Sequence, residues 1–91
     1  MQCLFPLGRT VATPGVLAAL EANHQTPTEF LNRHVLGNWG DLDDLDYAAN
    51  NRAVKDGERI LSAYHLDDDT KIYIITEHDR SSTCILLVED Y

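Results

Sequence analysis

The fold is decided by residues 59–88, which read "RILSAYHLDDDTKIYIITEHDRSSTCILLV". Side chains alternate between two sets along 59–66 and again along 71–76, and a period of two is typical of a strand with one buried face. Residues 84–88 form a short apolar run of the kind found in buried strands. Because only short polar loops separate the three runs, the stretch predicts three strands in an antiparallel meander.

Three helix patterns precede this stretch, within residues 13–57. Thr13 and Thr26 are each followed by a proline, which is the favoured order of an N-cap residue and a first helical residue. Glu29, three residues after the second threonine, completes a capping box. A third helix is predicted over 42–55, with a glycine two residues beyond it as a stop signal.

The third predicted helix has one apolar face, which we expect to be buried. Its members recur at spacings of three and four residues: Leu42, Leu45, Ala49 and Ala53. Before the first helix, residues 2–11 resemble extended or turn segments, and Pro6 keeps any strand there short or at an edge. Helices followed by strands predict an α+β fold, with helices covering one face of a sheet.

The full expectation is three short N-terminal helices packed on one face of a three-stranded antiparallel β-meander. The length of 91 residues favours a single domain over 1–91, with 1–57 mainly helical and 58–91 forming the meander. The sequence has no apolar run long enough for a membrane span, and its first ten residues lack the pattern of a signal peptide. We therefore expect a cytoplasmic protein that does not enter a membrane.

The charge is concentrated in the second half of the chain. Residues 1–40 hold two acids and two bases, whereas residues 41–91 hold 13 acids and five bases and so carry the whole net charge of −8. Direct binding of nucleic acid is disfavoured, because the phosphate backbone is bound through positive patches. A protein partner with a basic surface is electrostatically favoured instead.

The two cysteines, Cys3 and Cys84, are far apart in sequence and form no CxxC pair. In a cytoplasmic protein we expect them to be reduced and buried as small apolar residues, although a disulfide between the first and last strands is open on geometric grounds. Two lone cysteines do not form a zinc site.

A cluster of aspartates, "DLDDLD" at residues 41–46, is the first candidate site. A calcium loop starting at Asp41 fails at its fifth, sixth and twelfth positions, which are Leu45, Asp46 and Arg52. The cluster is better explained by helix capping, with Asp41 as N-cap, Asp43 and Asp44 in the first turn, and Asp46 one turn further on.

A second acidic group, Asp67, Asp68 and Asp69, lies in the predicted turn between the first two strands of the meander. Three neighbouring carboxylates could hold a cation weakly, but no second set of ligands is evident. We therefore predict no metal and no cofactor for this chain.

The loop at residues 78–83, "HDRSST", is the alternative site. It combines an acid–base group, a carboxylate, a guanidinium and hydroxyls, among them Asp79 and Arg80. The same composition suits a polar hairpin loop with an Asp–Arg pair. No phosphate-binding glycine loop, nucleophile elbow or HExxH pattern accompanies it, so we do not predict an enzyme.

Two ring side chains leave alternatives open. His34 lies on the apolar face of the second predicted helix, which favours a hydrogen-bonded core histidine over a ligand. Trp39, in the turn "GNWG", is either a buried anchor or, if exposed, the leading binding residue.

Five segments together carry a resemblance to a family. They are "LGRTVATPGVLAAL", "FLNRHVLGNWGDLDD", "RILSAYHL", "IITEHDRSST" and "LLVEDY", and they cover nearly the whole chain. The chain resembles a family of small bacterial, plasmid-related hypothetical proteins. It departs from the family pattern at Tyr73 and Val88, where tryptophan and proline are usual, and in the "DDDT" turn, where a glycine is usual. The resemblance implies one domain in a bacterial or phage setting and carries no activity.

The functional hypothesis is a small acidic interaction protein without catalysis. It would bind a protein with a basic, nucleic-acid-binding surface, as an anti-defence protein of a mobile element (of the anti-CRISPR or anti-restriction kind) or as a regulatory inhibitor. The charge would come from Asp41 to Asp46 and Asp67 to Asp69. The alternative is a small enzyme or ligand-binding domain built on the His78–Thr83 loop. The sequence leaves the oligomeric state open.

Overall fold

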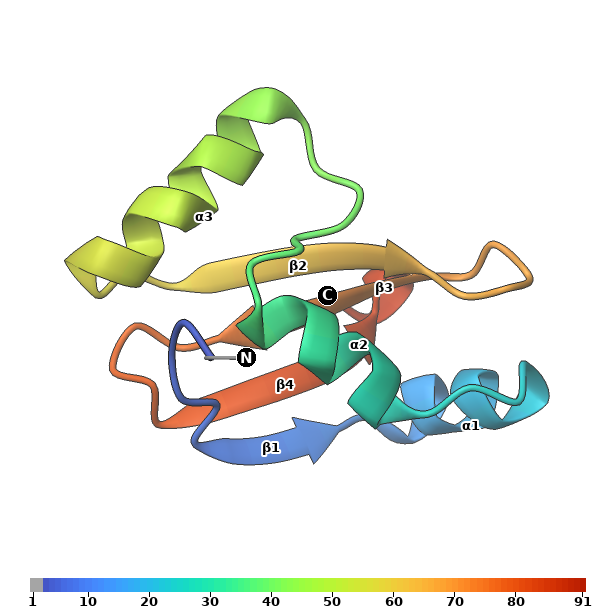
Figure 1. Ribbon diagram of the computed structural model, residues 1–91. Coiled ribbons are helices and arrows are strands. Elements are labelled where there is room, and N and C mark those ends of the chain that lie inside the picture. The colour runs from blue at the N-terminus through green and yellow to red at the C-terminus, as the bar shows by residue number, and fades with distance from the viewer. Residues whose placement is uncertain (1–2) are drawn as a thin grey trace.

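The computed structural model describes residues 3–91, which form one mixed sheet with three helices (Figure 1). The elements in chain order are β1 (Arg9–Ala12), α1 (Pro14–Ala22), α2 (Pro27–Val35), α3 (Asp44–Asp56), β2 (Ile60–His65), β3 (Lys71–Thr76), β4 (Ser82–Leu87) and the short 3-10 helix η1 (Val88–Asp90). None of the helices within these residues is long and apolar enough to cross a membrane.

The sheet has the strand order β1-β4-β3-β2, so the prediction of a three-stranded antiparallel meander is wrong. Consecutive strands β2, β3 and β4 do pair antiparallel, with Tyr73 of β3 opposite Ala63 on one side and Leu86 on the other. The difference is β1, which pairs parallel with β4 along the remaining edge. The helices therefore lie between strands in the chain rather than all before them.

Strand β1 was predicted as extended or turn material, and its pairing depends on a close approach at its start. Gly8 has φ +64°, and a Cβ atom at this position would lie 2.3 Å from the carbonyl oxygen of Arg80. Only glycine tolerates both that conformation and that contact. The next residue, Arg9, donates its backbone N–H to the Ser81 carbonyl at 3.0 Å, which starts the parallel pairing.

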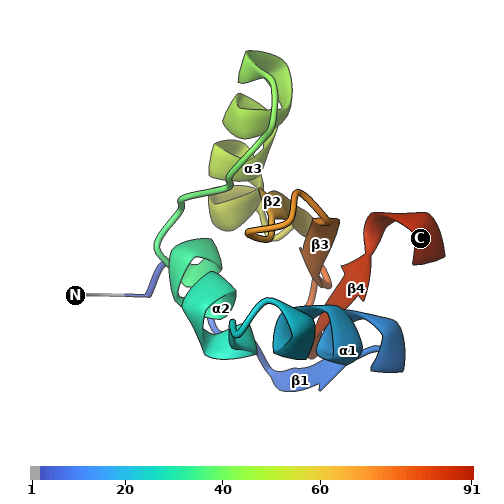
Figure 2. The same ribbon diagram turned by 90° about the vertical axis from the view of Figure 1, so that its right-hand side faces the viewer.

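Helices α1 and α2 cover the face of the sheet that carries Tyr64, Ile72 and Ile74, which we call the first face (Figure 2). The alternating sequence pattern predicted that one face would be buried. The prediction that these helices begin at Thr13–Pro14 and Thr26–Pro27 is confirmed. Thr13 caps α1 by accepting the backbone N–H of Val16, but Thr26 makes no side-chain cap bond, so the predicted capping box does not form. The main core between these layers contains Val16, Leu20, Phe30, Tyr64, Leu66, Ile72, Ile74, Ile85 and Leu87.

The second face of the sheet is partly covered by the chain's own C-terminal segment. The Tyr91 ring meets the Tyr73 ring edge-on, with centroids 5.4 Å apart, and the Arg59 guanidinium lies 5.9 Å from the Tyr91 ring centre. Ile75, on the same face as Tyr73, is 4% exposed. The covered area leaves Leu61, nearer the β2 edge, half-buried.

Helix α3 lies along the free edge of β2 instead of covering a face. The side-chain amide of Asn50 donates to the Leu61 carbonyl at 2.6 Å and accepts the Leu61 N–H at 3.2 Å, as a neighbouring strand would. Residues Gly40 and Ala63 form a parallel bridge next to this contact. The edge of β2 is thus occupied, which removes a template for unwanted strand pairing.

The predicted buried face of α3 is wrong in part. Leu45 is 82% exposed, whereas Asn50 and Ala53 are the buried residues of the helix. The helix begins at Asp44 rather than at Leu42, and Gly57 ends it in the left-handed conformation as predicted. The side of α3 that carries Asn50 and Ala53 is turned toward β2, because the two hydrogen bonds of Asn50 with Leu61, and not leucine packing, orient the helix.

Candidate functional site

Most of the predicted binding residues lie in two segments, which are the approach to α3 with its first turn and the turn that follows β2; Figure 1 shows the two segments apart from each other. We call these two segments together the acidic end; it comprises Asp41, Asp43, Asp44, Asp46, Asp67, Asp68 and Asp69. Two contacts join Asp41 to the C-terminal half of β2, which leads directly into Asp67 to Asp69. The Asp41 N–H donates to the Ala63 carbonyl at 2.7 Å, and the Asp41 carboxylate lies 2.9 Å from Nδ1 of His65.

The aspartates before α3 have different structural roles from those predicted. Asp43, and not Asp41, is the N-cap: its carboxylate accepts the backbone N–H of Asp46 at 2.8 Å. Asp44 and Asp46 lie in the first turn, where the helix dipole favours negative charge. Asp41 lies outside the helix and pairs with His65 instead. The cap lies later than predicted because the chain is first held against β2, by the Gly40–Ala63 bridge and the bond from the Asp41 N–H to the Ala63 carbonyl, before it turns into the helix.

The acidic turn between β2 and β3 is held by the connection between α1 and α2. The backbone N–H groups of Asp67 and Asp68 donate to the side-chain oxygens of Gln25 and Asn23, each at 2.9 Å. Asp68 also accepts the backbone N–H of Thr70, and hydrogen bonding from Thr70 lowers the pKa of its carboxyl. The turn therefore presents its charges from a fixed backbone.

Asp79 and Arg80 lie at the opposite end of the sheet, in the loop between β3 and β4 (Figure 1). The Arg80 guanidinium donates to three backbone carbonyls, of Ala53 at 2.9 Å, Glu58 at 2.6 Å and Glu77 at 3.1 Å. It thereby ties the end of α3 to the β3–β4 loop. Arg80 is a structural clamp, and its hydrogen-bonding capacity is directed inward.

Other polar side chains of the same loop also form hydrogen bonds within the protein. The Asp79 carboxylate accepts the backbone N–H of Ser81 at 3.0 Å, and hydrogen bonding from Ser81 lowers its pKa. The Thr83 hydroxyl is buried and donates to the Leu7 carbonyl. The loop does not bring His78, Asp79 and Arg80 together around a cavity, and neither of the two pockets described below is lined by it.

The charge at this opposite end is balanced. Asp56, Glu58, Glu77 and Asp79 are accompanied by Arg52, Lys55, Arg59 and Arg80 in the last turns of α3, the start of β2 and the loop. Arg59 and Glu77 form an ion pair at 3.7 Å. The seven aspartates of the acidic end therefore account for most of the excess negative charge, and Glu89, Asp90 and Lys71 make up the remainder.

Trp39 is fully buried and has no surface to offer a partner. Its indole N–H donates to Oδ1 of Asn51 at 2.9 Å, and its ring stacks against Phe5 with centroids 6.1 Å apart. Together with Val35, Ala53 and Ile60 it forms a second apolar core beneath α3. Trp39 is therefore a buried anchor, which is one of the two alternatives given above, and it is not a candidate contact residue.

His34 is a core residue with both ring nitrogens hydrogen-bonded, as its position on the apolar face indicated. Nδ1 lies 2.6 Å from the Ser62 hydroxyl and Nε2 lies 2.9 Å from the Thr76 hydroxyl. Thr76 in turn lies 2.7 Å from Thr83, whose proton goes to the Leu7 carbonyl.

This chain of contacts defines where each proton lies. Because Thr83 uses its proton on a carbonyl, it must accept from Thr76, which must then accept from His34 Nε2–H. Nδ1 is left as the acceptor of the Ser62 proton, so the network holds a neutral imidazole. Burial lowers the pKa of His34 to about 4, and the nearby Arg80 charge acts in the same direction.

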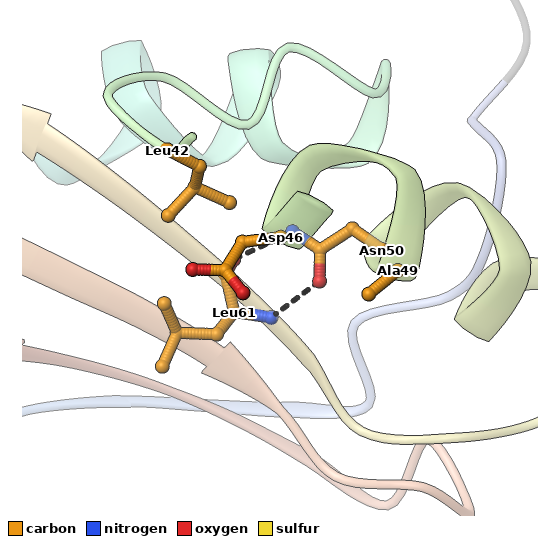
Figure 3. Close-up of a pocket in the computed structure, with 5 residues that line it drawn as sticks. All are labelled: Leu42, Asp46, Ala49, Asn50 and Leu61. Carbon is orange, nitrogen blue, oxygen red and sulfur yellow. Dashed lines mark hydrogen bonds between the residues drawn. The ribbon is translucent and has the colours of Figure 1, made fainter. Parts of the chain in front are cut away.

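One pocket of about 210 Å³ adjoins the acidic end, between α3 and the edge of β2 (Figure 3). Its lining consists of Leu42, Asp46, Ala49, Asn50 and Leu61. Sequence reasoning singled out Asp46 but not the pocket. The missed signal is that Asp46, Ala49 and Asn50 recur at spacings of three and four residues, and so share a side of the helix.

Comparison of the chain with protein-family models, with curated proteins and with solved structures finds no match. The resemblance to small bacterial hypothetical proteins therefore stays a prediction. Among residues 3–91, no three His, Cys, Asp or Glu side chains are placed so that they could hold a metal ion. Cys3 and Cys84 are both free, and Cys3 is exposed rather than buried as predicted. The site with the most distinctive chemistry is the acidic end with its pocket.

Proposed function

We propose that this protein is a non-catalytic binding protein whose acidic end contacts a basic protein surface. The observation that carries the proposal is the distribution of charge. Seven aspartates lie in two segments that are linked through the Asp41–His65 contact, with Lys71 opposite His65 as the nearby base, whereas the opposite end pairs its acids with nearby bases. Within the described residues, the Asp41 carboxylate contacts the His65 ring, and Lys71 is the basic residue that follows the second aspartate segment. Carboxylates without counter-charges attract a cationic surface and speed its association.

The partner proposed is a nucleic-acid-binding protein, because such proteins carry dense positive patches. Backbone N–H groups hold the carboxylates of Asp43 and Asp68, and further bonds fix the backbone of the "DDDT" turn. A preorganised set of anions loses little conformational freedom on binding. In its sharpest form the protein occupies a groove that otherwise holds phosphates and acts as an inhibitor, of the kind that mobile elements direct against host defence.

Two matched variants test the proposal, and each changes the net charge from −8 to −5. The acidic-end variant carries Asp44→Asn, Asp46→Asn and Asp69→Asn. The control variant carries Asp56→Asn, Glu58→Gln and Asp79→Asn, all exposed residues of the opposite end. Asn at position 69 suits the left-handed backbone there, with φ 69°, and Asn at position 79 keeps an oxygen for the Ser81 N–H.

The measurement is retention of basic proteins from a nuclease-treated bacterial lysate on each immobilised protein, followed by elution with rising NaCl and, separately, with duplex DNA. We expect the wild type and the control variant to retain the same basic proteins and to release them with either eluent. The acidic-end variant should retain roughly tenfold less, since three attractive charge contacts are removed. Equal retention by the two variants, no retention at all, or elution that is insensitive to salt would contradict the proposal.

A further inference from the structure

We propose that the pocket between α3 and β2 receives a single lysine or arginine side chain of the partner, with its aliphatic stem against the apolar walls and its charge at the Asp46 carboxylate. The inference rests on the proposed function. It adds which side chain of the basic partner is recognised and which pocket binds it. It is carried by the shape and lining of the pocket together with the position of one carboxylate.

The walls of the pocket are apolar. Leu42, Ala49 and Leu61 supply them from three different segments: the approach to α3, the helix itself and β2. Figure 3 shows the Asn50 amide turned to the backbone of Leu61, and the two bonds of 2.6 and 3.2 Å occupy both of its functional atoms. Asn50 is therefore part of the wall and does not contribute a free donor or acceptor.

Asp46 is the charged residue of the lining. In Figure 3 its carboxylate lies between the side chains of Leu42 and Leu61. Among residues 3–91, no hydrogen bond or ion pair engages this carboxylate; the backbone N–H of Asp46 is the group that binds Asp43. A free carboxylate beside apolar walls matches a group that is apolar along its length and cationic at its tip, which describes lysine and arginine.

The size of the pocket separates this occupant from a metabolite. Pockets that bind drug-sized ligands enclose about 300–1,000 Å³, whereas this one encloses about 210 Å³. A volume below that range suits one side chain of a larger partner. A second pocket, of about 220 Å³, is lined by Cys3, Asn32, Val35 and Leu36 and has no charged side chain, so it offers no comparable selectivity for a cation.

The surroundings of the pocket complement a basic segment. Asp43 and Asp44 precede Asp46 in the first turn of α3, and their charges offset the positive end of the helix dipole that a cation would meet. Leu45, which is 82% exposed, lies one helical turn from Ala49 on the outer wall. A partner residue next to the inserted side chain can therefore contact an apolar surface, while further basic residues face the aspartates.

The test titrates the ¹⁵N-labelled full chain with capped pentapeptides that differ only at the central residue. Lysine supplies stem and charge, norleucine supplies the stem alone, and diaminopropionate supplies the charge on a short stem. We expect the lysine peptide to shift the amide resonances of the five lining residues and to bind at least about fivefold more tightly than the other two, because only lysine satisfies walls and carboxylate together.

Matched variants locate the binding. Asp46→Asn removes the pocket charge and Ala49→Leu fills the pocket; Asp56→Asn and Ala48→Leu make the same changes at exposed positions of α3 that do not line the pocket. We expect the first pair to weaken lysine-peptide binding at least about fivefold and the second pair less than twofold. Equal effects of Asp56→Asn and Asp46→Asn, or shifts centred outside the pocket, would overturn the inference.

The two proposals fail in different ways. If Ala49→Leu leaves the retention of basic proteins and its salt dependence unchanged, the pocket is not the recognition site, although the acidic end still binds. If the acidic-end variant and its control retain basic proteins equally, the proposed function itself is wrong. A lysine peptide that binds the pocket while no basic protein is retained would leave the pocket chemistry standing and reject the acidic end as a protein-binding surface.

Discussion

His34 makes the stability of this protein depend on pH. Its ring is fully buried, and its pKa of about 4 lies well below the 6.5 of an unfolded histidine. As the pH falls below 6.5, the unfolded chain binds a proton at His34 that the folded chain excludes. The folded state is therefore unaffected by His34 above pH 6.5 and is progressively destabilised as the pH falls from 6.5 to 4. We expect a loss of ~3 kcal/mol in the free energy of unfolding across that window.

Urea unfolding between about pH 7 and pH 4.5 measures this slope. His34→Gln, which cannot titrate, should be less stable at neutral pH and should lose much less stability on acidification. His78→Gln, at an exposed loop position, is the control and should follow the wild type. Hydrogen bonding lowers the pKa of Asp68 and Asp79, so both carboxyls titrate at more acidic pH than this window. A wild-type slope that persists in His34→Gln would assign the effect to other groups.

For single residues, the predictions from sequence were correct where a structural role depends on neighbouring residues in the chain. The Thr-Pro pairs located two helix starts, Gly57 located a helix end, and the apolar surroundings of His34 indicated a core residue. The N-cap of α3 was misplaced by two residues, from Asp43 to Asp41. Several aspartates in succession satisfy the same capping rule, and the bridge at Gly40 that selects among them is a tertiary contact.

Helix α3 depends on Asn50 for its attachment to the sheet. Asn50→Ala leaves the N–H and the carbonyl of Leu61 without their partners, and we expect a loss of roughly 2 kcal/mol of stability, somewhat offset by the better helix propensity of alanine. Asn50→Asp should cost at least as much, because a carboxylate oxygen would then face the Leu61 carbonyl oxygen, which now accepts the amide N–H at 2.6 Å.

Urea unfolding and the hydrogen-exchange rate of the Leu61 amide test this prediction together. Arg52→Ala, an exposed change in the same helix, is the control for general effects on α3. If Asn50→Ala exchanges at Leu61 as slowly as the control does, the side chain is not what protects the edge of β2.

Two elements show why the fold was only partly predictable. Strands β2 and β3 alternate in sequence and β4 contains a short apolar run, so all three strands are visible in the sequence. Strand β1 has no fully buried residue and pairs with a strand some seventy residues away, as Arg9 with Ser82, so neither pattern nor proximity reveals it. The face of α3 was mistaken because Asn50, rather than Leu45, turns inward.

For the whole molecule, part of the site's arrangement follows from strand direction alone. In an antiparallel hairpin the turn before β3 and the loop after it must lie at opposite ends, so Asp67 to Asp69 and Asp79 could not form one site. The pocket had no such signal, because Leu42 and Leu61 meet only through the packing of α3 against an edge strand. What the sequence could indicate was the excess of charge; its location at one end required the fold.

That location predicts a salt dependence of stability in the absence of any partner. Like charges held close together repel and destabilise the folded state, and salt relieves the repulsion as the Debye length shortens from about 30 Å at 0.01 M to about 8 Å at 0.15 M. The wild type should therefore melt at a higher temperature as NaCl is added over this range. The acidic-end variant should melt higher than the wild type at low salt and respond less to NaCl, since three members of the cluster are neutral.

The control variant has the same net charge of −5 but keeps the cluster intact, so its melting temperature should rise with salt as the wild type's does. Its low-salt melting temperature should not increase, because the acids it loses lie among Arg59, Arg80 and the other bases of the opposite end. Thermal unfolding of the three proteins at matched salt concentrations separates the effect of net charge from the effect of the clustered aspartates. If both variants respond to salt equally, net charge alone governs stability, and the aspartates at the acidic end are too far apart to act as one surface.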